Sequence, residues 1–315
     1  MHAADKVNGL TEGERTISRT AYFHLPGLFE FQELYRIFLR LFREHREYFY
    51  DWCEISSVYG APAGCLWDGG RVGAGDARPE DVTALMWEYG ISPCLTFSNC
   101  LLREEHLDDA RCNALCALIE KNEAIPGGVV ISSDLLLERL KKKYPGLYFV
   151  SSTTKVLNTF EALERELNRD AFRYVVPDFR LNRELEQLDA LSEAQKQKVE
   201  FLCNECCWYG CAERKVCYEN VSRRNLGEEC REHVCASPTA GRGYRFSDAM
   251  KNPGFIGRED IRDVYLPKGF SHFKIEGRGL GSAVVLEMLL YYLTKPEWQI
   301  AVREEIYLDS MLDLF

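Results

Sequence analysis

The amino-acid sequence predicts an α/β protein with the architecture of a (β/α)8 TIM-type barrel. Short β-branched or aromatic runs recur along its 315 residues, and each run ends in polar residues or glycine. Most runs are followed by an amphipathic helical stretch, which is the pattern of a parallel sheet covered by helices. Eight such strand–helix units in a chain of this length match the size of a single-domain barrel.

The predicted strands and helices alternate along most of the chain. Strands are expected at the short apolar runs, as for strands buried on both faces of a sheet; they cover residues 21–25, 50–55, 94–97, 128–131, 148–150, 174–176, 200–202 and 272–275. Helices are expected where apolar residues recur about every 3.6 positions; they cover residues 31–48, 79–89, 103–121, 133–143, 156–169, 182–198 and 282–293. Pro79 and Ser133 open two of these helices, and acidic residues follow both, near the positive end of the helix dipole.

One irregular stretch, residues 204–271, interrupts this alternation. It carries most of a cysteine cluster, has no long periodic helix beyond residues 211–223, and is rich in proline and glycine towards its end. The pattern predicts an insertion after the seventh strand, at the end of the barrel where active sites are built. The expected organisation is a polar segment at residues 1–19, one barrel over residues 20–295 with this insertion, and a C-terminal tail at residues 296–315.

Composition limits the classes of partner. The net charge is −10, with 39 Lys and Arg against 49 Asp and Glu, so the chain lacks the general cationic surface that binds nucleic acid. A single base flipped into a pocket would not need such a surface, so this kind of nucleic-acid substrate stays open. No apolar run approaches the roughly eighteen residues that span a bilayer, and the first twenty residues are polar. The expected location is the cytoplasm, with no membrane partner.

Polar residues follow each predicted strand, where a parallel barrel places its chemistry. The candidates for substrate binding are Arg71, Asn99 and Asp178, and the candidates for catalysis are Lys155, Glu276 and Arg278. Arginine can hold a carboxylate or phosphate through two parallel hydrogen bonds, although an arginine on a glycine-rich loop is often merely solvated. Asp178 has a competing interpretation as a turn residue.

Glu276 and Arg278 are separated by one residue and therefore share a face of an extended segment. They could hold a polar substrate together or close a structural ion pair inside the barrel mouth, and the first interpretation is favoured here. Ser133 and Thr154 are expected to cap helices rather than to catalyse. His24 and His272 lie in or beside strands, so they are expected to be satisfied core histidines.

Seven of the thirteen cysteines lie between Cys203 and Cys235. Thiolates this close in sequence suit tetrahedral zinc or an iron–sulfur cluster. Buried free cysteines or a disulfide knot are the alternatives, but an odd cysteine count without a secretion signal argues against a disulfide scaffold. A radical S-adenosylmethionine site needs Cys-x3-Cys-x2-Cys, and after Cys207 and Cys211 the third position is Arg214.

Residues 270–278, FSHFKIEGR, follow the run IRDVYLPKG and resemble the collagenase-like peptidase family U-32. Members of that family carry a similar LKIEGR stretch late in the barrel, after a cysteine-bearing segment. The resemblance extends over residues 20–295 and is strong over residues 199–280. It implies a (β/α)8-type barrel that holds a 4Fe-4S cluster on four cysteines. It also implies hydroxylation or redox chemistry, on RNA bases or quinone precursors, more than proteolysis.

The resemblance also implies a set of cluster ligands. The best match to the family's pattern is Cys207 with Cys211, followed downstream by Cys235, and Cys230 is the nearest candidate for the fourth ligand. The alternatives for this fourth position are Cys112, Cys203 and Cys217. The family's usual Gly-Ser/Ala-x-Cys lead-in is replaced by Asn204-Glu-Cys-Cys207, which leaves the type of cluster open.

Three functions follow from these observations. The favoured one is an iron–sulfur barrel enzyme acting on a small or modified organic substrate, with an electron-donor protein as a further partner if the cluster relays electrons. The second is a zinc-stapled barrel, in which four thiolates only rigidify the insertion. The third is a peptidase, although the sequence shows neither a nucleophile–base pair nor catalytic-zinc histidines.

Overall fold

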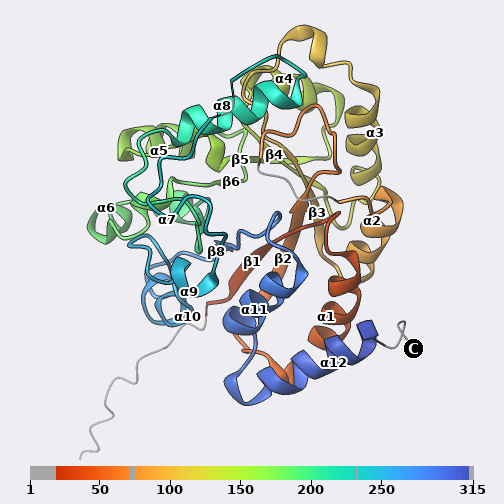
Figure 1. Ribbon diagram of the computed structural model, residues 1–315, viewed down its shortest axis with the longest axis vertical. Coiled ribbons are helices and arrows are strands. Elements are labelled where there is room, and N and C mark those ends of the chain that lie inside the picture. The colour runs from red at the N-terminus through yellow and green to blue at the C-terminus, as the bar shows by residue number, and fades with distance from the viewer. Residues whose placement is uncertain (1–18, 71–74, 232, 312–315) are drawn as a thin grey trace, which may run out of the picture.

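The computed structural model describes residues 19–70, 75–231 and 233–311. Eight parallel strands form a nearly closed barrel with the helices packed outside it, which confirms the predicted fold class (Figure 1). The strand order is β6-β5-β4-β3-β2-β1-β8-β7. A parallel bridge between Val175 of β6 and Val199, directly before β7, joins the two ends of this order.

The strands are short and follow the predictions closely, with one exception. They are β1 (Ala21–Pro26), β2 (Cys53–Gly60), β3 (Ser92–Phe97), β4 (Gly128–Ile131), β5 (Tyr148–Ser151), β6 (Tyr174–Val175), β7 (Glu200–Leu202) and β8 (His272–Lys274). The prediction for the second strand, residues 50–55, was wrong because its polar continuation was taken for a loop. Ser57 lies inside β2, where its hydroxyl is 2.8 Å from the ring of His24 on β1, so a buried partner satisfies it.

The helices cover the outside of the barrel and fill the insertion. They are α1 (Gln32–Glu44), α2 (Pro79–Glu88), α3 (Ala110–Ile119), α4 (Asp134–Lys143), α5 (Phe160–Leu167), α6 (Leu185–Asp189), α7 (Glu193–Lys196), α8 (Arg214–Asn225), α9 (Phe246–Ala249), α10 (Arg258–Asp260), α11 (Ser282–Leu293) and α12 (Gln299–Met311). Ser133 caps α4 as predicted, since its hydroxyl accepts a hydrogen bond from the backbone of Leu136.

Several predicted boundaries differ from the structure; the helix expected at residues 103–121, for example, is α3 and begins only at Ala110. The helix expected at residues 156–169 begins after Thr159, because Val156 has a φ of 54° that no α-helix accepts. The helix expected at residues 182–198 is broken into α6 and α7, and Ser192 caps the second piece. The expected tail at residues 296–315 instead contains α12, which packs against α1 (Figure 1). The expected N-terminal segment lies outside the described residues except for Arg19.

Two apolar cores lie on opposite faces of the sheet. On β4, Val129 and Ile131 belong to the larger core between strands and helices, whereas Val130 belongs to a smaller cluster inside the barrel. This alternation follows from the two-residue period of a strand. The inner cluster draws on β2 to β7 and contains no residue of β1 or β8, so the interior beside β1 and β8 is available to polar side chains.

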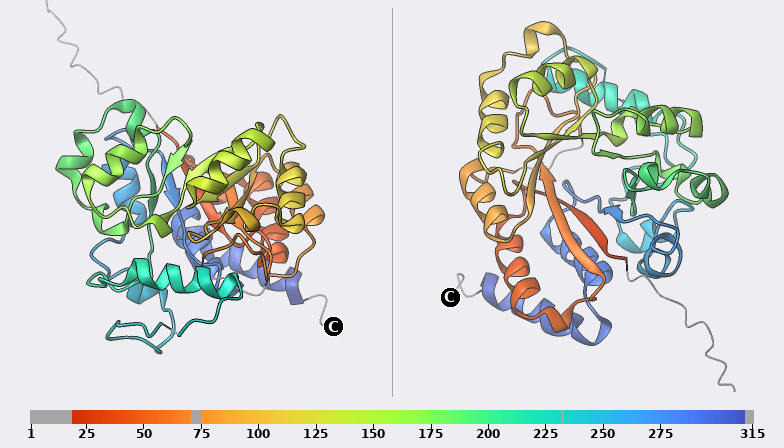
Figure 2. Two further views of the ribbon diagram at one scale, coloured as in Figure 1. Left: turned by 90° about the horizontal axis from the view of Figure 1, so that it is seen from above. Right: turned by 180° about the vertical axis from the view of Figure 1, so that it is seen from behind.

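Helix α8 of the insertion lies across one end of the barrel (Figure 2). Its Ser222 carbonyl accepts a hydrogen bond from Asn99 after β3, and its Asn225 side chain donates to the Asp68 carbonyl after β2. Arg214, at its N-terminal end, donates to Thr153 after β5. The insertion therefore covers the carboxyl ends of the strands, as predicted.

Candidate functional site

A cavity of about 330 Å³ lies at the carboxyl ends of the strands, beneath the insertion. Its walls include apolar and polar side chains, among them Tyr59, Leu202, Cys206, Lys274, Glu276 and Arg278. A cavity of this size, mostly apolar with a few polar groups, is suited to a small organic molecule.

Strand β8 and the residues after it supply three charged groups to this cavity. Lys274, Glu276 and Arg278 stand at every second position and line the cavity together. Phe273 and Ile275, between and before them, point the other way and are buried in the outer core. The predicted shared face of Glu276 and Arg278 is therefore present in the structure.

Arg278 is held by an ion-pair network of the protein itself. Its Nε donates to Glu30 at 3.0 Å, its Nη1 to the Thr96 hydroxyl at 2.7 Å, and its Nη2 to Asp68 at 3.2 Å and to the Ala61 carbonyl at 3.1 Å. Burial alone would lower the pKa of Arg278, but Asp68 and Glu30 together raise it. Arg278 is therefore held in a structural ion-pair network, but its carboxylate partners are Glu30 and Asp68 rather than Glu276.

Lys274 is the charged cavity residue that the sequence analysis missed. It is buried, its Nζ lies 2.6 Å from Oε1 of the buried Glu200 on β7, and it stands 3.9 Å from the centre of the Tyr59 ring. The strand period could have identified it, because Lys274 occupies the position two residues before Glu276 on the same face. Its partner Glu200 opens β7, where an acidic residue in an apolar strand was an available signal.

Below Lys274, two histidines continue the polar side of the barrel interior. His24 Nε2 lies 3.8 Å from Glu200 and 3.2 Å from His272 Nδ1, and the His272 ring packs on Tyr174. Burial, then the positive charges of Lys274 and Arg173, hold the pKa of His24 well below its ordinary value. Burial, followed by the charge of His24, lowers the pKa of His272 to about 3. Both are satisfied, buried histidines, as predicted.

These lowered pKa values predict a loss of stability in mild acid. Below about pH 6.5 the unfolded chain protonates His272 while the folded chain does not, so the free energy of unfolding falls as the pH decreases towards about 3. One such histidine contributes about 1.4 kcal/mol per pH unit within this window. Urea unfolding at pH 7, 6 and 5 should show a shallower dependence of the unfolding free energy on pH for His272→Phe than for the parent. Equal slopes for His272→Phe and the parent would contradict the assignment.

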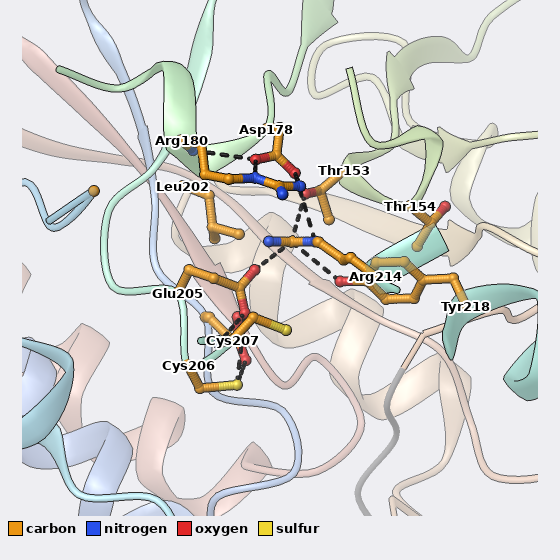
Figure 3. Close-up of polar contacts among 12 residues, drawn as sticks. Thr153, Thr154, Asp178, Arg180, Leu202, Glu205, Cys206, Cys207, Arg214 and Tyr218 are labelled. Carbon is orange, nitrogen blue, oxygen red and sulfur yellow. Dashed lines mark hydrogen bonds and ion pairs between the residues drawn. The ribbon is translucent and has the colours of Figure 1, made fainter. Parts of the chain in front are cut away.

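Cys206 and two glutamates meet at the rim of the cavity. Cys206 Sγ lies 2.8 Å from Oε1 of Glu276 and 3.6 Å from Oε1 of Glu205, three residues after the end of β7. Figure 3 shows Cys206 beside Glu205. Potential ligand atoms of these three residues all lie within 4.8 Å of one another. One thiol with two carboxylates is a donor set that zinc accepts, so this group could hold a single metal ion.

Arg214 forms a second buried charge cluster beside this rim. It lies between Asp178 and Glu205 in Figure 3, hydrogen-bonded to Glu205, to the Thr153 hydroxyl at 3.1 Å and to the Tyr218 hydroxyl at 3.2 Å. The predicted substrate ligand Asp178 is fully buried and accepts hydrogen bonds from the side chain of Arg180. Its contacts are therefore internal, and it does not line the cavity.

Lys155 and Asn99 are not brought to the cavity. Lys155 lies outside it, with its ammonium 2.5 Å from Glu166 of α5. Asn99 is fully buried and ties the end of β3 to α8 and to the backbone of Leu66. Arg71 lies outside the described residues. Contacts with residues distant in the sequence hold Lys155 and Asn99 away from the cavity, and no local sequence pattern reveals these contacts.

None of the four predicted cluster ligands belongs to a close group of potential ligands for a single metal ion among the described residues. Among the described residues, the group of three or more potential metal ligands within 4.8 Å of one another consists of Glu205, Cys206 and Glu276, and includes none of the four. Cys230 Sγ lies 3.7 Å from the Asn220 amide, and Cys235 is exposed. The cluster stays a prediction from the sequence.

Comparison with solved structures finds one described as the structure of the U32 peptidase Mk0906. The match covers 88% of this chain and 97% of that chain, with 15% sequence identity and a TM-score of 0.48. A scan against protein-family models finds no match, and neither does a search of curated proteins. Within the described part of the chain, none of the helices has the length and apolar character to cross a membrane.

Proposed function

We propose that this protein is a U32-like barrel enzyme that transforms a small organic molecule bound in the cavity beneath the insertion. The observation that carries the proposal is the convergence of Lys274, Glu276 and Cys206 on one largely apolar cavity at the carboxyl ends of the strands. An amine, a carboxyl group and a thiol are the side chains that serve as acids, bases and nucleophiles.

The walls of the cavity favour a catalytic role for Lys274, Glu276 and Cys206 over a role as solvated surface groups. Val130, Leu202 and the Tyr59 ring contribute apolar wall, and a water-poor cavity strengthens electrostatic interactions between catalytic groups and a bound molecule. Glu276 and Cys206, 2.8 Å apart, can share a proton and pass it to or from a substrate. General acid–base catalysis of this kind typically contributes about 10²- to 10⁴-fold in rate.

If the cavity binds a small molecule, some ligands should stabilise the parent protein but should not stabilise a variant whose cavity is filled. A library of small organic metabolites should contain compounds that raise the melting temperature, because a ligand at 100 times its Kd stabilises by about 2.7 kcal/mol. Leu202→Trp, which fills the cavity, should abolish the shift, whereas Leu308→Trp on the exposed face of α12 should keep it. If hits stabilise both tryptophan variants equally, the cavity is not the binding site.

The iron–sulfur part of the proposal is supported by cysteine density and by the FSHFKIEGR resemblance, and no chemical step is derived through a cluster. Anaerobic purification followed by metal and sulfide analysis should give about four iron and four acid-labile sulfide per chain. Cys207→Ser with Cys211→Ser should remove them. A result of one zinc and no sulfide per chain would contradict the iron–sulfur cluster. If that zinc were lost in Glu276→Gln but kept in the Cys207/Cys211 variant, its site would be the cavity rim.

A further inference from the structure

We propose that Lys274 is a catalytic amine that forms an imine with an aldehyde or ketone group of the molecule bound in the barrel cavity. This inference rests on the proposed function in one respect, which is that the cavity receives a small organic molecule. It goes further by naming the reacting atom of the protein and the chemical class of the substrate.

The position of Lys274 is the first argument. Its side chain projects from β8 into a cavity of about 330 Å³ and is buried from bulk water. Barrel interiors are normally filled by branched apolar residues, and a buried ion pair gives little net stability compared with apolar residues of similar volume. The Lys274–Glu200 pair is therefore not explained by stability alone, whereas a reactive amine needs this location.

A comparison with Arg278, four residues further along the same face, is the second argument. Arg278 is anchored by two carboxylates, a hydroxyl and a carbonyl, so its side chain is fixed to the protein. Lys274 has one carboxylate contact, to Glu200, and one aromatic face, from Tyr59. An ammonium has three N–H groups. Lys274 therefore has donor capacity left on the side that lines the cavity.

Proton transfer is the third argument, because an imine forms only from the neutral amine. Glu200 Oε1, 2.6 Å from Nζ, is positioned to accept a proton from it. The second oxygen of Glu200 faces His24 at 3.8 Å, and the lowered pKa of His24 keeps this ring neutral. Lys274 is thus the close cationic partner of Glu200, and the two side chains can exchange a proton.

The remaining groups complete the reaction. The Nζ lone pair adds to the carbonyl carbon, the C–N bond forms as the C=O π bond breaks, and the oxygen becomes a hydroxyl on protonation. That hydroxyl takes a proton from the Cys206–Glu276 pair and leaves as water, while the nitrogen lone pair closes the C=N bond. Of the two N–H protons that the nitrogen loses, one supplies the protonation of the oxygen and the other returns to the Cys206–Glu276 pair. The sum is amine plus carbonyl to imine plus water, and no oxidant or reductant is consumed.

Reductive trapping tests the proposal without knowledge of the natural substrate. The full chain is incubated with acetaldehyde, glycolaldehyde, acetone or pyruvate in the presence of cyanoborohydride, and labelling of each lysine is followed by peptide mass spectrometry. At least one probe should label Lys274 in a saturable manner, and at least about tenfold faster than the exposed Lys251, because binding holds carbonyl and amine together. Glu200→Gln should slow this labelling.

Lys155 is the matched control within the same chain. It forms a similar close pair with Glu166 but lies outside the cavity, so it should react slowly, and Glu166→Gln should leave Lys274 labelling unchanged. Labelling of Lys274 no faster than that of Lys155 with all four probes would overturn the imine proposal. If the metabolite screen still finds ligands that Leu202→Trp excludes, the cavity function stands and only the imine falls. If Leu202→Trp leaves fast labelling of Lys274 intact, the cavity assignment falls instead.

Discussion

Arg278→Met is expected to lower the free energy of unfolding by about 3–5 kcal/mol, because it leaves Glu30 and Asp68 as buried carboxylates without their shared cation. The substituted side chain keeps much of the volume, so the loss reports on charge rather than on a cavity. Burial already raises the pKa of Glu30 in the presence of Arg278. Without the guanidinium, Glu30 takes up a proton more readily, so the loss should be smaller at pH 5 than at pH 8.

Urea unfolding at the two pH values measures this effect, and an exposed arginine provides the control. Arg303 forms a two-point ion pair with Glu287 on the surface, so Arg303→Met should change stability by less than about 1 kcal/mol. A loss for Arg278→Met that is as small as the control's would mean that the network does not hold the barrel mouth together. The free guanidinium would then be available to a substrate, as the sequence analysis had favoured.

Lys274→Met is the second substitution with a large expected effect, again about 3–5 kcal/mol, since it leaves the Glu200 carboxylate buried without its cation. Adding Glu200→Gln removes that charge as well. The double variant should therefore be more stable than Lys274→Met alone, with a coupling energy of about 0.5–3 kcal/mol between the two positions. Denaturant unfolding of the parent, the two single variants and the double variant gives this coupling directly.

Additive losses in this cycle would contradict the ion pair described for Lys274 and Glu200. A matched cycle on Lys155 and Glu166, which form a similar pair outside the cavity, separates general ion-pair energetics from any property of the barrel interior. The double variant of Lys274 and Glu200 also serves the trapping experiment, because it lacks the amine while keeping the fold.

The fold was predictable because its signals are local. Residues 128–131 and 200–202 were predicted as strands and form β4 and β7 with the same bounds, since apolar β-branched runs between polar residues need no distant information. The second strand was misplaced because Ser57 looks like a loop residue until His24, 33 positions away, is seen beside it. Helix ends were misjudged where a capping hydroxyl such as Thr159 decided the start.

The site was predictable only in part. Reading the carboxyl ends of the strands identified Glu276 and Arg278, which both line the cavity, but not Glu30 and Asp68, the carboxylates that pair with Arg278. The same reading included Lys155 and Asn99, whose partners turn them away from the cavity. It missed Lys274, although the two-residue period of β8 pointed to it.

The sequence by itself determined the barrel, the insertion over its mouth and the face of β8 that supplies charge, because periodicity and turn residues act over a few positions. The tertiary structure alone decided which polar side chains face the cavity and which pair with one another. Lys274 meets Glu200 across 74 positions, and Arg278 meets Glu30 across 248. Closure of the barrel creates these contacts, so no stretch of sequence short enough to be read alone contains them.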